Sequence, residues 1–168
     1  MKADRTNLQR MSLDRTDKRI LKELQKNGGL SNLELADKVG LSPSPCSRRV
    51  KALEDAGIIK QRVAILDSKK LGLDLTALIS ISMDRHTPER FENFERQVMS
   101  FEEVQECYLI TGQSADYQLK IVVADMDEFQ QFLLGKLTRI DGVTGVHSSF
   151  VMRKVQDSTA LPLSHVAS

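Results

Sequence analysis

The chain has 168 residues, of which 40% are hydrophobic and 28% charged, enough for one large domain or two small ones. The formal net charge of +1 hides an asymmetry, because residues 1–66 hold 14 Lys and Arg against 8 Asp and Glu, whereas residues 67–168 hold 10 against 15. A basic first part indicates an anionic polymer as its partner. Two cysteines, Cys46 and Cys107, exclude a disulfide framework and a cysteine metal site, and no apolar run reaches the ~20 residues of a membrane span.

The first part begins with a short arm and a helix. Residues 1–12 carry charge without an apolar core, which is typical of a disordered N-terminal arm rather than a secretory signal. A helix is predicted next, with Ile20 and Leu21 on its buried side. Asp14 and Asp17 stand near its N-terminus, where the helix dipole favours acids.

Residues 31–59 contain two short helix patterns around a Gly-Leu-Ser-Pro turn. Ser31 and Glu34 form a capping box that opens the first of them. Gly40 suits the left-handed position that ends it, and Ser42 is expected to cap the second.

The second of these helices separates its apolar and cationic residues. Cys46, Val50 and Leu53 recur at i, i+4 and i+7 and predict a buried stripe. The opposite face carries small and cationic residues that a DNA major groove accepts, namely Ser44, Ser47, Arg48 and Lys51, with Arg49 flanking the stripe. Taken alone, such a segment is more often a core piece with a solvated charged face.

Its neighbours favour the DNA-binding interpretation. A helix precedes the pair, and the β-branched run IIKQRVAIL follows it, carrying Lys60 and Arg62. Three helices and a basic strand in this order predict a winged helix-turn-helix over residues 13–66.

The runs LDRTDKRILKELQKNG and SNLELADKVGLSPSPCSRRVKALEDAGII resemble the DNA-binding domain of the leucine-responsive/asparagine-responsive (Lrp/AsnC, feast/famine) transcriptional regulators. The most specific part is Leu-Ser-Pro-x-Pro-Cys-x-x-Arg-Val-x-x-Leu-Glu at residues 41–54, and the likeness extends from residue 13 to about 163. It implies a non-enzymatic regulator that binds double-stranded DNA in a sequence-specific manner, in the cytoplasm at the bacterial nucleoid. The candidate DNA-binding residues are Ser31, Asn32, Ser44, Ser47, Arg48, Arg49, Lys51, Lys60 and Arg62.

The acidic part predicts a second domain of a different class. The polar, Gly-containing residues 67–74 are expected to be a linker. From 75 to 155, alternating strands and amphipathic helices follow in the order β-α-β-β-α-β, which predicts a ferredoxin-like four-stranded antiparallel sheet with two helices on one face. The whole chain is therefore expected to be α+β. Residues 156–168 form a tail that either packs on the sheet domain or frays.

One face of this sheet is left without a covering helix. Strict alternation puts Leu78, Cys107, Leu109 and Val151 on it, which is too apolar for water, so dimerisation through the sheet is expected. The resemblance implies an effector-binding domain whose homodimers assemble to tetramers or octamers, with an amino acid bound between dimers near the loop joining the second and third strands. The candidate effector-binding residues are Leu109, Thr111, Gly112, Gln113, Ser114, Asp116, Tyr117, Met126, Ser149, Phe150 and Val151.

The loop at 111–116 offers what a zwitterion needs: backbone N–H groups, hydroxyls and the carboxylate of Asp116. Apolar Leu109, Met126 and Val151 favour an aliphatic or sulfur-containing side chain, although the loop is one residue longer than in the leucine-responsive form. Asp116 has the alternative role of a turn residue that caps a strand.

No cofactor and no metal are expected, because the three histidines share no motif and no phosphate loop or nucleophile elbow is visible. Two other functions compete with the regulator. One is an architectural DNA protein without an effector. The other is an amino-acid-metabolic enzyme with a regulatory domain, for which the sequence leaves no catalytic segment.

Overall fold

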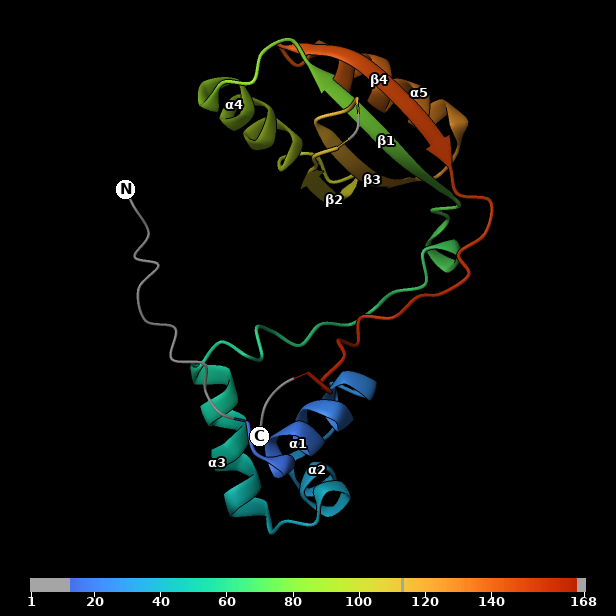
Figure 1. Ribbon diagram of the computed structural model, residues 1–168. Coiled ribbons are helices and arrows are strands. Elements are labelled where there is room, and N and C mark those ends of the chain that lie inside the picture. The colour runs from blue at the N-terminus through green and yellow to red at the C-terminus, as the bar shows by residue number, and fades with distance from the viewer. Residues whose placement is uncertain (1–12, 113, 166–168) are drawn as a thin grey trace. The chain divides into compact units, whose positions relative to one another are not determined.

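The computed structural model describes residues 13–112 and 114–165. The chain divides into two compact units (Figure 1): of the described residues, 13–65 and 156–165 belong to the first, and 66–112 and 114–155 belong to the second. The predicted arm at residues 1–12 lies outside the described part.

The first unit contains three helices, α1 (Arg15–Lys26), α2 (Asn32–Val39) and α3 (Pro43–Asp55). Asp14 caps α1 in a capping box with Asp17, and Ser31 caps α2 in the predicted box. Gly40 has a φ of 67° and ends α2 in the left-handed conformation. Ser42 is the N-cap of α3, but its side chain makes no capping hydrogen bond, so α3 begins on the fixed φ of proline alone.

The core of this unit confirms the predicted stripe of α3. Cys46 and Leu53 are fully buried and Val50 is nearly so, in one cluster with the apolar sides of α1 and α2. The buried cluster comprises Leu13, Ile20, Leu21, Leu35, Ala36, Val39, Cys46, Val50 and Leu53.

The basic run after α3 differs from the prediction. Residues 60–66 form no strand, and Val63, Ile65 and Leu66 are about 70% exposed. β-branched residues favour a strand only where a neighbouring strand and a packed surface are present, and the described chain supplies neither at this run.

The C-terminal segment, residues 156–165, also differs from the prediction. It belongs to the three-helix unit and not to the sheet unit. Leu163 packs against the helical core, and Leu161 hydrogen-bonds Gln25 of α1.

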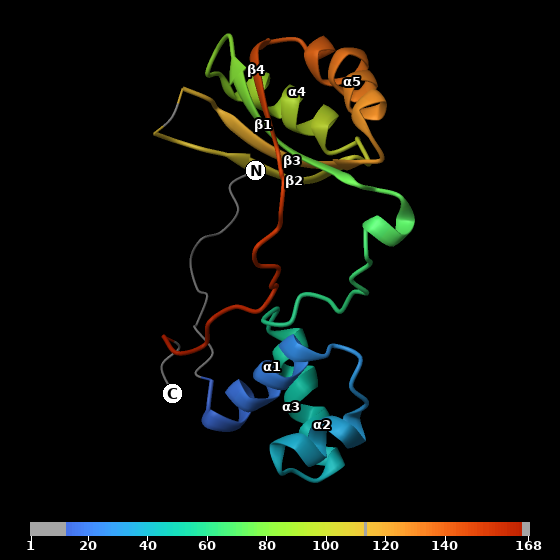
Figure 2. The same ribbon diagram turned by 90° about the vertical axis from the view of Figure 1, so that its right-hand side faces the viewer.

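The second unit has the predicted order and topology. Its elements are η1 (Lys69–Leu71), β1 (Leu75–Met83), α4 (Pro88–Val98), β2 (Val104–Leu109), β3 (Tyr117–Val123), α5 (Met126–Gly135), η2 (Leu137–Arg139) and β4 (Val143–Phe150). The strands form one antiparallel sheet in the order β2-β3-β1-β4, and α4 and α5 cover one face of it (Figure 2). This is the ferredoxin-like arrangement.

The uncovered face of the sheet is less apolar than expected. Cys107 pairs with Leu119 and Leu109 pairs with Tyr117, so both lie on the helix-covered face. The cause is a bulge after Val104, which inserts one residue into β2 and reverses the alternation beyond it. Burial accordingly raises the pKa of the Cys107 thiol to about 11. The register leaves a largely polar set on the uncovered face: Thr76, Leu78, Ser80, Ser82, Glu106, Tyr108, Gln118, Lys120, Val122, His147 and Ser149.

Candidate functional site

The outer face of α3 presents a small cationic surface to solvent. Ser44, Ser47, Arg48 and Lys51 are all exposed, opposite the buried stripe of the same helix. Within the described part of the chain, neither Arg48 nor Lys51 has an ion-pair partner. Their charges are therefore available to an anionic partner, and we refer to these four residues as the α3 outer face.

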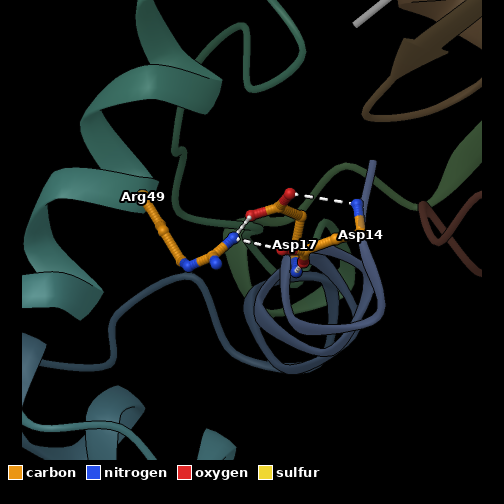
Figure 3. A network of polar contacts seen from close by, with 3 residues as sticks. All are labelled: Asp14, Asp17 and Arg49. Carbon is orange, nitrogen blue, oxygen red and sulfur yellow. Dashed lines mark hydrogen bonds and ion pairs between the residues drawn. The ribbon is translucent and has the colours of Figure 1, made fainter. Parts of the chain in front are cut away.

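Arg49 has a different environment from Arg48. One of its guanidinium nitrogens, Nη1, lies 2.7 Å from Oδ2 of Asp14 and 2.7 Å from Oδ1 of Asp17 (Figure 3). The hydrogen bonds to Asp17 and then Asp14 raise the pKa of Arg49. The pKa of Asp14 is lowered, first by the backbone N–H of Asp17 and further by Arg49. Arg49 thus ties α3 to the start of α1.

The remaining candidate DNA contacts also have structural roles. Ser31 is occupied by the capping box of α2, and Asn32 donates from Nδ2 to the carbonyl oxygen of Pro43 at 2.8 Å. The Asn32 bond fixes the start of α3 relative to α2. Arg62 pairs with Glu54 at 2.9 Å, whereas Lys60 is exposed.

The candidate effector residues lie at two ends of the sheet in a single chain. Tyr117 pairs with Ile81 on β1, and Phe150 pairs with Ala77, four residues away. At about 3.4 Å per residue the two positions are about 14 Å apart along the strand. We call the first set the loop group: Leu109, Thr111, Gly112, Ser114, Asp116 and Tyr117. We call the second the strand-end group: Met126, Ser149, Phe150 and Val151.

Asp116 is the charged member of the loop group, and its carboxylate is already bonded. Oδ2 accepts the backbone N–H of Met83 at 2.7 Å, and Oδ1 lies 2.8 Å from Nε2 of His86. These contacts correspond to the alternative role of Asp116, a turn residue at the start of a strand.

Other loop-group members divide into exposed and buried side chains. Thr111 and Ser114 are exposed, and Gly112 adopts a φ of 87°. Tyr117 is buried and donates its hydroxyl to Glu95 at 2.8 Å; burial raises the pKa of Tyr117. Gln113 lies outside the described residues.

Three members of the strand-end group, Ser149, Phe150 and Val151, line an open groove of about 570 Å³. The groove is lined by Leu78, Ser149, Phe150, Val151, Met152, Arg153 and Val155. Its lining is mainly apolar, with one cation at Arg153. Arg153 was not a candidate in the sequence, because it stands in a stretch without periodicity. Met126 begins α5 and is half exposed, and the Phe150 ring contacts Phe129 of α5 at 5.0 Å between centroids.

Two family models match these units. Residues 13–60 match a winged helix-turn-helix DNA-binding model, and residues 76–161 match the Lrp/AsnC ligand-binding domain. The chain belongs to the Lrp/AsnC family of transcriptional regulators. It is a DNA-binding regulator and not an enzyme, and its winged helix-turn-helix precedes an α+β ligand-binding domain.

Relatives match over nearly their whole length. The transcriptional regulator AzlB of Bacillus subtilis is 42% identical over 154 residues, which cover 92% of this chain and 98% of AzlB. The leucine-responsive regulatory protein of Escherichia coli K12 is 42% identical over 149 residues, covering 89% of this chain and 90% of that protein. A Neisseria meningitidis transcriptional regulator, solved as a complex with L-Met, superposes with a TM-score of 0.87 at 44% identity, covering 91% of this chain and 98% of its own.

Among the residues that the structure describes, no group of three or more His, Cys, Asp or Glu side chains could hold a metal ion. None of the helices described is both long and apolar enough to span a bilayer.

Proposed function

We propose that this regulator reads its operator through the α3 outer face and changes its DNA binding when an amino acid binds the second unit. Its target genes are those of amino-acid metabolism or transport. It acts in the cytoplasm, at the bacterial nucleoid. The observation that carries the DNA-binding part is the exposure of Arg48 and Lys51 on a helix whose other side is buried.

Not all candidate cations have the same part in DNA binding. Arg48 and Lys51, with Ser44 and Ser47, enter the major groove and contact bases or phosphates. Lys60 contacts the DNA backbone. Ser31, Asn32, Arg49 and Arg62 act mainly by holding the helices in position, since each already has a bond inside the unit.

The effector site is formed between subunits, because one chain holds the loop group and the strand-end group at separate ends of its sheet. Thr111, Gly112 and Ser114 of one subunit supply hydroxyls and backbone N–H groups to the polar end of the amino acid. The strand-end group of a neighbouring subunit supplies the apolar groove for its side chain, with Arg153 close to the carboxylate.

The groove favours an aliphatic or sulfur-containing amino acid. Leu78, Phe150, Val151 and Met152 line it with apolar surface, and its one cation, Arg153, is assigned to the effector carboxylate. A charged effector side chain would therefore lose hydration against an apolar wall. The L-Met complex of the Neisseria meningitidis relative, at 44% identity, supports this class.

A thermal-shift screen against the twenty amino acids tests the effector proposal. A ligand at a hundredfold excess over its dissociation constant stabilises the folded protein by about 2.7 kcal/mol, which raises the melting temperature. We expect leucine, isoleucine, valine or methionine to give the largest rise and to alter DNA affinity. If no amino acid at millimolar concentration changes melting, oligomer size or DNA affinity, the architectural DNA protein is the better description.

Gel-shift titration tests the DNA-binding surface separately. Arg48→Ala should weaken operator binding by about 1–3 kcal/mol if the guanidinium bonds a guanine in bidentate fashion. Arg96→Ala on α4 of the second unit is the matched control for losing one exposed cation. Equal affinity of Arg48→Ala and wild type at several salt concentrations would refute the assignment.

A further inference from the structure

The C-terminal segment, residues 156–165, belongs to the three-helix unit and is hydrogen-bonded to α1. The Gln25 side-chain amide bonds both backbone groups of Leu161. Its Nε2 donates to the Leu161 carbonyl at 3.2 Å, and the Leu161 N–H donates to its Oε1 at 2.6 Å. The Gln25 side chain thus pairs both the N–H and the C=O of Leu161, as a neighbouring strand does for a residue in a β-ladder.

A second anchor follows two residues later. Leu163 is half-buried against the core of the three helices, whereas the side chain of Leu161 is 72% exposed. Pro162 between them fixes its own φ and restricts Leu161 to extended conformations. The segment is therefore held through the backbone of Leu161 and the side chain of Leu163, in a conformation that costs little entropy to order.

The other end of this stretch begins in the candidate effector groove. Directly after β4, the backbone N–H of Val151 donates to Thr76 at 2.9 Å, and Val151, Met152, Arg153 and Val155 line the groove. The chain then continues from Val155 into the docked segment. A ligand that shifts the groove wall therefore acts on residues that are covalently continuous with the contact on α1.

The contact continues within the first unit to the DNA-reading helix. α1 holds Gln25 near its C-terminal end and is joined at its start to α3 through the ion pairs of Arg49 with Asp14 and Asp17. A change in the position of α1 is thus transmitted to α3, which carries Arg48. The transmitting contacts are the two ion pairs of Arg49, each 2.7 Å long.

We propose that residues 156–165 are a second link between the two units, which passes the state of the effector groove to the DNA-binding helices through Gln25 and α1. The first link is the chain between α3 and β1. This inference rests on the proposed function, because it names the route by which the effector changes DNA binding.

Three variants of the full-length chain separate the contact from the side chains around it. Gln25→Ala removes both bonds to Leu161, and Leu163→Ala removes the apolar anchor. Leu161→Ala is the matched control, since it keeps the bonded backbone groups and removes a side chain that is largely exposed. Hydrogen exchange at the amide of residue 161 reports docking directly. We expect it to be several-fold faster in Gln25→Ala and Leu163→Ala and unchanged in Leu161→Ala.

The second readout is the ratio of DNA affinities with and without millimolar L-methionine or L-leucine. We expect wild type and Leu161→Ala to have the same ratio, and Gln25→Ala and Leu163→Ala to approach a ratio of one. In the absence of amino acid, the DNA affinity of Gln25→Ala and Leu163→Ala should stay within about twofold of that of wild type.

Two results overturn the proposal. In the first, wild type responds and the two releasing variants exchange faster at residue 161 yet keep the wild-type ratio; the link is then wrong and the effector function stands. In the second, wild type itself shows no response to either amino acid; the effector function then fails, and the link's role fails with it.

Discussion

At the scale of single residues, two adjacent arginines on α3 have different roles. Arg48 is exposed, whereas Arg49 bonds two carboxylates of α1. Helical geometry placed Arg49 beside the apolar stripe, but it could not identify its partners, because Asp14 and Asp17 are more than thirty positions away in sequence. A cation next to an apolar stripe can reach groups across the helix interface, so such positions are poor guides to a DNA contact.

The lowered pKa of Asp14, caused first by the backbone N–H of Asp17 and further by Arg49, makes the stability of the first unit depend on pH. The pKa of Asp14 is lowered below its ordinary value near 3.8, so its contribution is present above that value and is lost as the pH falls through the folded-state pKa. Asp14→Asn keeps a capping oxygen but loses the charge. We expect wild type to lose stability more steeply than Asp14→Asn between about pH 5 and about pH 3.

Urea denaturation followed by circular dichroism at several pH values measures this difference. Lys51→Ala, which removes an exposed cation of the same unit, is a control that leaves Asp14 and its bonds unchanged. Parallel pH profiles for wild type and Asp14→Asn would contradict the expectation.

Asp116 supports a second prediction at this scale, because its carboxylate accepts the N–H of Met83. Asp116→Ala leaves that N–H without a partner and should cost about 1–3 kcal/mol of stability. Asp116→Asn retains an acceptor oxygen and should cost less. His86→Ala, which removes the other contact of the carboxylate, separates the two bonds. The free energy of unfolding by urea measures all three, and equal losses for Ala and Asn would show that the Met83 bond contributes little.

At the scale of elements, the sequence predicted those helices and strands whose partners are close or whose pattern is uninterrupted. The alternation of β1 from Leu75 to Met83 and the stripe of α3 through Val50 both correspond to buried positions. The bulge after Val104 could not be read, because one inserted residue leaves no mark in a hydrophobic pattern and yet reverses the face of Cys107 and Leu109.

Segments that depend on a distant partner were predicted least well. The β-branched run at 60–66 has strand propensity but no partner strand in the described chain. The tail contact depends on Gln25, more than a hundred residues from Leu161, and polar side-chain contacts of this kind have no periodicity. For the candidate site, sequence placed the α3 outer face correctly on the exposed side but could not show that the effector residues lie at two ends of the sheet.

The turn before β4 provides a prediction about an element. Gly142 has a φ of 97°, and an added Cβ would lie 2.6 Å from Cδ of Arg90, whose guanidinium bonds Asp84 and Asp141. Gly112 has a similar φ of 87° and open space around it. Both Gly→Ala changes carry backbone strain of about 1–2 kcal/mol, and only Gly142→Ala also displaces Arg90.

Gly142→Ala should therefore be less stable than Gly112→Ala. The difference in unfolding free energy should be close to the loss caused by Arg90→Ala alone. Thermal unfolding of Gly112→Ala, Gly142→Ala and Arg90→Ala measures the comparison. Equal melting temperatures for the two glycine variants would mean that the Arg90 contacts adjust without loss.

At the scale of the whole molecule, the effector proposal requires more than one chain. The loop group and the strand-end group are about 14 Å apart along β1, too far for one small amino acid to contact both in the same subunit. We therefore expect at least a dimer at micromolar concentration, measured by light scattering, and an operator with approximately two-fold symmetric half-sites. The division of the effector site is a stronger argument for oligomerisation than the uncovered sheet face, because that face is largely polar.

Mixing two blocked variants tests the division directly. Ser114→Glu places a charge in the loop group, and Ser149→Glu places one in the strand-end groove; both serines are exposed, so the fold should be retained. Each variant alone should lose the amino-acid response.

After the two variants are mixed, unfolded and refolded together, about a quarter of the sites would combine an intact loop with an intact strand end from different subunits. That fraction of the amino-acid response should return. Calorimetric titration of the mixture with L-methionine or L-leucine measures the recovered sites, and the double variant Ser114→Glu/Ser149→Glu mixed with itself is the control. A mixture that binds no more amino acid than either parent would place the site within one chain.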